Sequence, residues 1–178
     1  ELASCLVGSE MCIRDSYKYP GRTVSELIAS GLPITVELAF YAVLFALLLG
    51  VLSGIIASLN PGKFLDYFPM SISMIGICVP SIILGPILIL IFGIWIDILP
   101  VSGWGEFSGD KILPTITLGS AYAAIFARLT RGGMLEILAQ DFIRTARAKG
   151  LNETRVVFFH ALRGGIMLNV GFLGLAIA

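Results

Sequence analysis

Long charge-free runs divide the chain. Residues 38–62 carry no charged side chain over 25 positions, residues 67–96 none over 30, and residues 112–127 none over 16. Because about 20 apolar residues in a helix cross the hydrocarbon of a bilayer, the first two runs predict complete membrane spans. The third run predicts another span if the arginines that follow it extend toward the headgroups. A fourth apolar run, 164–178, holds 15 residues and predicts a partial span.

Prolines and glycines refine these spans. Glu37 follows Pro33 by one helical turn, so we expect it in the first turn of the first span, near the outer interface, with a substrate contact as the alternative. Pro80 and Pro86 interrupt the second span and predict a kink. We expect spans at about residues 33–59, 67–96 and 112–130, a partial span at 162–178, and a connecting loop at 131–161.

Composition indicates that these spans lie in a membrane, and the charge distribution indicates their orientation. The chain is 57% hydrophobic and 13% charged, whereas charged residues make up about 25% of a soluble domain. The zero net charge hides a basic connection after the third span, and the positive-inside rule places that connection in the cytoplasm. Counting spans backward then places residues 97–111 outside. The cations are Arg128, Arg131, Arg144, Arg147, Lys149, Arg155 and Arg163, against Glu136, Asp141 and Glu153.

The basic connection contains a polar segment with helix signals, residues 141–150. Asp141 is a suitable N-cap, residues 142–149 form about two turns, and Gly150 suits the left-handed position after the helix. Asn152 is positioned to cap a second helix. At 100° per residue, Phe142, Ile143 and Ala146 share one side, and Arg144 and Arg147 lie away from it. Cations alone could set topology and contact anionic lipid, but a capped helix ending in glycine favours docking to another protein.

The same segment carries a family resemblance. Arg144-Thr-Ala-Arg-Ala-Lys-Gly150, followed ten residues later by His160-Ala-Leu-Arg163, resembles the cytoplasmic "EAA" loop of ABC-importer permeases, in the variant of oligopeptide and dipeptide permeases. The resemblance covers nearly everything from residue 16 onward, including the Val79-Pro-Ser81 turn and Ala127-Arg-Leu-Thr-Arg-Gly132. The general motif has Glu-Ala-Ala at residues 144–146 and Ile-x-Leu-Pro at residues 160–163, and both departures match the peptide-permease variant.

The resemblance implies an all-α, polytopic membrane helix bundle of the ABC importer permease type, truncated at both ends, in a bacterial or archaeal inner membrane. It implies peptide transport, with a second permease subunit, two cytoplasmic ATPase subunits and an extracytoplasmic peptide-binding protein as partners. ATP and Mg would bind the ATPase subunits, with no cofactor in this chain and no nucleic acid as partner. The residues expected to couple to the ATPases are Asp141, Arg144, Thr145, Ala146, Arg147, Ala148, Lys149, Gly150 and His160.

Residues 1–15 fit none of this pattern. They resemble a translated adapter peptide, so we expect a non-native leader before a permease domain at residues 16–178. Two of the three cysteines lie in this leader, and Cys78 lies inside an apolar span, where a lone cysteine is typically a small hydrophobe.

The sequence offers little support for an enzymatic function. Gly62-Lys63 lacks the upstream glycine of a P-loop, and one histidine favours neither a metal site nor a triad, so we predict no catalytic or metal residues and name no substrate-binding residues. Asp66 and Asp97 flank the second span at opposite faces, which makes them boundary charges. The alternatives are a membrane-embedded enzyme and an ion-gradient-driven transporter. The first needs paired catalytic groups, which the sequence does not show. The second needs ionisable residues within the spans, and these spans are nearly free of them.

Overall fold

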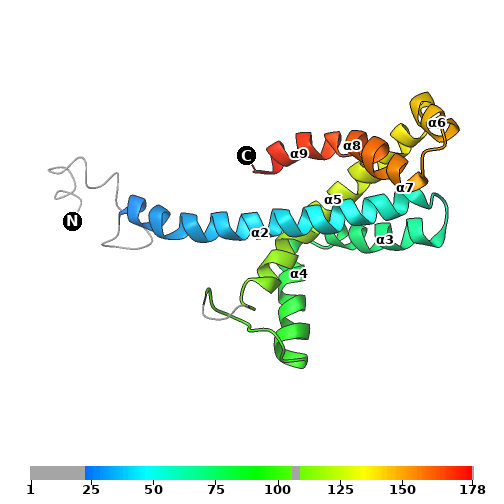
Figure 1. The fold of residues 1–178 in the computed structure, drawn as a ribbon. Coiled ribbons are helices and arrows are strands. Elements are labelled where there is room, and N and C mark those ends of the chain that lie inside the picture. Colours follow the sequence, from blue (N-terminus) through cyan, green and yellow to red (C-terminus); the bar gives the residue numbers. More distant parts are fainter. Residues whose placement is uncertain (1–22, 106–108, 178) are drawn as a thin grey trace, which may run out of the picture. The chain divides into compact units, whose positions relative to one another are not determined.

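A computed structural model describes residues 23–105 and 109–177, and its elements are helices (Figure 1). This confirms the all-α prediction. The leader at residues 1–15 lies outside the described residues. The elements are α2 (Val24–Leu59), α3 (Phe64–Cys78), α4 (Ser81–Leu88), the π-helix η1 (Ile89–Trp95), α5 (Ile112–Leu138), α6 (Asp141–Ala148), α7 (Glu153–Arg155), the π-helix η2 (Val156–Ala161), α8 (Leu162–Gly165) and α9 (Met167–Ile177).

Among the described residues, three helical stretches are long and apolar enough to cross a membrane. They are Val24–Leu59 with 36 residues, Ile112–Leu138 with 27 and Glu153–Gly174 with 22. The last begins earlier than the predicted partial span at 162–178, because Asn152 caps its first turn. The predicted loop 131–161 is therefore mostly helical, since α5 continues to Leu138 and α6, α7 and η2 follow it.

The first span starts before Pro33. A capping box begins α2, in which the Glu26 N–H donates to Thr23 Oγ1 at 3.3 Å and the Thr23 N–H donates to Glu26 Oε2 at 3.4 Å. These reciprocal bonds satisfy backbone donors at the helix start, so Pro33 lies inside the helix. The expectation that Glu37 occupies the first turn is therefore wrong.

The predicted second span is broken rather than gently kinked. The pair Phe64–Cys78 and Ser81–Trp95 is bent by 107°, and α4 departs steeply from α3 in Figure 1. Val79 has extended angles, φ −96° and ψ 115°, because the ring of Pro80 disfavours helical geometry in the residue before it. Proline also lacks the N–H that would continue the helix.

Small residues let α2 and α5 approach closely. A Cβ at Gly50 would lie 2.6 Å from the Ala123 carbonyl oxygen, and one at Gly54 would lie 2.5 Å from Thr130 Cβ. Without a hydrophobic driving force between helices in lipid, such van der Waals contact holds spans together. Gly50 and Gly54, which lie four residues apart on α2, thus serve packing within this chain.

A second contact joins α9 to α5. The side chain of Asn169 is buried and its Nδ2 donates to Thr130 Oγ1 at 2.6 Å. The rings of Phe126 and Phe172 meet edge to face, with centroids 5.6 Å apart. These contacts place α9 beside the helix that leads to α6.

The predicted membrane orientation can be tested by cysteine labelling. In a cysteine-free full-length subunit, we expect Ser102→Cys to react with an impermeant maleimide on intact cells, and Thr154→Cys to react only after permeabilisation. Both residues are exposed, so access depends on the side of the membrane, which the positive-inside rule assigns. Labelling of both from one side would contradict the span count.

Candidate functional site

The predicted docking segment is a separate short helix, α6. It follows α5 after a two-residue connection and begins at Asp141. Gln140 is the N-cap, with extended angles of φ −77° and ψ 153° and no side-chain capping bond. The prediction that Asp141 caps the helix is wrong, because Asp141 already has helical geometry. Its carboxylate instead lies in the first turn, where the helix dipole favours an acid.

One face of α6 is fixed to the rest of the chain. Ile143 and Ala146 are buried together with Val156, and Ile137 and Leu151 pack against them. Phe142 was predicted on this buried side, but it is 47% exposed. Phe142 precedes Ile143 by one residue, or about 100° around the helix. Its side chain therefore lies beside the buried surface that contacts α5 and η2, not within it. An aromatic ring therefore remains on the free face of α6.

The end of α6 follows the predicted glycine pattern. Gly150 has a φ of +79°, the left-handed conformation that glycine adopts without strain. The Gly150 N–H donates to the Arg147 carbonyl at 2.9 Å, and the Leu151 N–H donates to the Ala146 carbonyl at 3.4 Å. These two bonds and the Leu151 contact form a Schellman motif. The predicted cap of the next helix is also confirmed, since Asn152 Oδ1 accepts from the Thr154 N–H at 3.4 Å.

An ion pair crosses the Gly150 turn. Arg147 Nε donates to Glu153 Oε2 at 3.1 Å, and Arg147 Nη2 donates to Glu153 Oε1 at 2.5 Å. The hydrogen bonds to this carboxylate raise the pKa of the Arg147 guanidinium above its ordinary value. Because the guanidinium holds both carboxylate oxygens, the pair links the end of α6 to the start of α7 across the turn. The two residues are six positions apart across a turn, which is no helical spacing, so this pair could not be predicted from the sequence pattern.

The remaining predicted coupling residues divide into two groups. Arg144, Thr145, Ala148 and Lys149 are exposed on α6. His160 lies apart on η2, also exposed, and among the described residues no hydrogen bond or ion pair joins it to α6. The structure therefore gathers the predicted residues 141–150 on one short helix and the turn after it, without His160.

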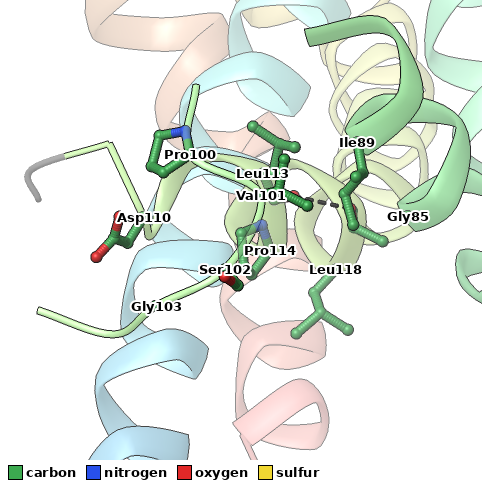
Figure 2. Close-up of a pocket in the computed structure, with 11 residues that line it drawn as sticks. Gly85, Ile89, Pro100, Val101, Ser102, Gly103, Asp110, Leu113, Pro114 and Leu118 are labelled. Atoms are coloured by element: carbon green, nitrogen blue, oxygen red, sulfur yellow. Dashed lines mark hydrogen bonds between the residues drawn. The ribbon is translucent and has the colours of Figure 1, made fainter. Parts of the chain in front are cut away.

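A cavity of about 310 Å³ lies near the start of α5 (Figure 2). Segment 100–103, Gly85 of α4 and Ile89 of η1 complete its walls. Its lining is mainly apolar, and the Asp110 carboxylate points away from the other side chains drawn in Figure 2. No residue of a substrate cavity is predicted from the sequence. Its lining residues are Gly85, Ile89, Pro100, Val101, Ser102, Gly103, Asp110, Leu113, Pro114, Thr117 and Leu118.

The part of the chain that the structure describes contains no evident metal-binding site. No group of three or more His, Cys, Asp or Glu side chains there is arranged to hold a metal ion. The cysteine in this part, Cys78, is free and exposed.

Comparison with known proteins places residues 46–178 in the family described as "Binding-protein-dependent transport system inner membrane component". The oligopeptide transport system permease protein OppB of Haemophilus influenzae is 44% identical over 160 residues, which is 89% of this chain and 52% of the relative. OppB of Escherichia coli K12 is 41% identical over the same shares. The dipeptide transport system permease protein DppB of Bacillus subtilis is 39% identical over 163 residues, 92% of this chain and 53% of the relative. The chain thus spans about half the length of these relatives.

Proposed function

We propose, from the premise that the chain belongs to the family of inner membrane components of binding-protein-dependent transport systems, that it is part of the permease subunit of an ATP-driven peptide importer. The cargo would be oligopeptides or dipeptides, as named for the OppB and DppB relatives. The subunit itself would carry no catalytic residues. It would lie in a bacterial or archaeal plasma membrane as a multi-pass protein.

The observation that carries this proposal is the construction of α6. The helix is held on one face by Ile143 and Ala146, closed at its end by the Gly150 turn, and braced by Arg147 and Glu153. A helix this short is marginal in water unless tertiary contacts hold it. The chain therefore maintains a rigid surface directly after a membrane span, as a contact that transmits movement requires.

The proposed partner of this surface is a cytoplasmic ATPase subunit. Phe142, Arg144 and Lys149 are exposed on α6 or at its end, and interfaces are enriched in aromatic and arginine anchors. Two ATPase subunits would bind ATP and Mg, a second permease subunit would complete the pathway, and a binding protein would deliver peptide from outside. ATP-driven closure of the ATPases would displace α6 and so shift the spans between two states, since only contacts that differ between states move such an equilibrium. The domain assignment at residues 16–178 and the role of His160 remain part of this proposal.

The test measures ATPase binding by a Phe142→Ala subunit. We expect the association of the full-length subunit with its ATPase chains in detergent to weaken by roughly 30-fold, the effect of losing a central aromatic anchor, with membrane abundance unchanged. Phe159→Ala is the matched control, because Phe159 is 71% exposed but lies on η2. Equal loss in both variants, or unchanged binding by Phe142→Ala, would contradict docking through α6.

A further inference from the structure

Asp66 and Arg131 form a partly buried, two-pronged ion pair. Arg131 Nε donates to Asp66 Oδ1 at 2.6 Å, and Arg131 Nη2 donates to Asp66 Oδ2 at 2.8 Å. The Gly62 N–H also donates to Asp66 Oδ2, at 3.0 Å. The Asp66 side chain is 3% exposed and that of Arg131 33%. Three donors on one carboxylate make Asp66 a built junction, not the solvated boundary charge that its position in the sequence predicts.

This junction joins elements that are far apart in the chain. Asp66 lies in the first turn of α3, and Arg131 lies on α5, about two turns before the helix ends at Leu138. Because α6 follows after only two further residues, Arg131 lies just ahead of the proposed ATPase contact. The pair therefore ties α3 to the end of α5 that would receive the movement of α6.

A second contact fixes α3 to α5 farther along both helices. A Cβ at Gly76 would collide with the Ser120 carbonyl oxygen, so the two backbones touch there. With an ion pair at one end and backbone contact toward the other, α3 has little freedom to slide or tilt on α5. Packed elements held in this way shift between discrete arrangements rather than deforming continuously.

The end of α3 leads toward the cavity. After the break at Pro80, the chain continues into α4, whose Gly85 lines the cavity together with Leu118 of α5 (Figure 2). Movement of α3 together with α5 would therefore reach one wall of the cavity from the α6 end of the molecule.

We propose that Asp66 and Arg131 are positioning residues that make α3 follow α5, so that displacement of α6 is transmitted to the cavity wall formed by α4. This inference rests on the proposed function. The pair holds α3 and α5 in register in both transport states, and no substrate or nucleotide contacts it. Loss of the pair uncouples ATP hydrolysis from peptide movement.

The test compares transport with hydrolysis in the reconstituted complex of full-length subunit, partner permease, ATPases and binding protein. Labelled alanine oligopeptides serve as probe, and the readout is peptide taken up per ATP hydrolysed. We expect Asp66→Asn and Arg131→Gln each to lower this ratio by about tenfold, within the range of coupling energies found for residues between sites. The double variant is expected to equal the worse single variant, because both remove the same link.

Arg128→Gln is the matched control. Arg128 lies on α5 one turn before Arg131 and is exposed, so its loss removes the same charge without touching the junction, and we expect a wild-type ratio. If the Asp66 and Arg131 variants fail to reach the membrane, Arg131→Lys decides, because lysine keeps the charge but not the two-pronged geometry. We expect it to lower the ratio at normal membrane abundance and normal ATPase association.

Wild-type ratios in Asp66→Asn and Arg131→Gln, or in Arg131→Lys where those two are not assembled, would overturn the positioning role and leave the proposed function intact. Additive losses in the double variant would also overturn it. A wild-type complex without ATP-dependent peptide uptake would instead overturn the proposed function, and the positioning role with it.

Discussion

Gly54→Leu is expected to disrupt the packing of α2 on α5 and to lower the free energy of unfolding of the subunit by about 3 kcal/mol, at the upper end of the usual cost of overpacking. The added Cβ alone would lie 2.5 Å from Thr130 Cβ and 2.7 Å from the Ala127 carbonyl oxygen. One of these is a backbone atom, so a change of side-chain rotamer cannot relieve the collision. The helices must separate, which also disturbs the Thr130–Asn169 hydrogen bond.

The measurement is thermal unfolding of the detergent-solubilised full-length subunit, compared with Gly132→Leu. A Cβ at Gly132, on α5, meets no heavy atom within 4 Å among the described residues. The control therefore makes the same glycine-to-leucine change in a helix without a collision, and we expect near-wild-type stability. Equal unfolding temperatures for Gly54→Leu and wild type would show that α2 and α5 do not pack through Gly54.

Gly150→Val is expected to abolish peptide uptake while the subunit remains in the membrane. Valine at a φ of +79° carries strain of about 1 to 3 kcal/mol, and a Cβ there meets no heavy atom within 4 Å among the described residues. The effect is therefore one of backbone conformation. Relief of the strain would break the Schellman bonds, move Leu151 off the buried face of α6 and separate Arg147 from Glu153. The spans are held in the bilayer by far larger transfer free energies.

The measurement combines membrane abundance, ATPase association and peptide uptake in the assembled complex. Gly150→Asn is the control, because asparagine tolerates the left-handed conformation, and we expect most of the uptake to survive. Wild-type uptake by Gly150→Val would remove this turn from the coupling mechanism, and loss of the protein from the membrane would assign Gly150 to folding instead.

The sequence by itself determined the local structure of this protein. Charge-free runs located the membrane helices, and Gly150 and Asn152 marked the turn after α6 and the cap after it, because these features depend on neighbours within a few residues. The sequence pattern predicted the first residue of each helix less well. Thr23 and Glu26 form a capping box that starts α2, whereas Pro33 indicated a later start. Gln140 rather than Asp141 is the N-cap of α6, since several polar residues near a helix start compete for one position.

Only the tertiary structure decided which distant residues meet. The junction of Asp66 with Arg131 spans 65 positions, and it depends on the register in which α3 lies along α5, a quantity that neither helix encodes alone. Tertiary packing likewise buried Ile143 and left Phe142 exposed. The apolar side of α6 is wider than the surface that α5 and η2 offer, so only part of it is covered. It also directed Gly50 and Gly54 onto α5, since a small-residue spacing specifies close approach but not the helix that approaches.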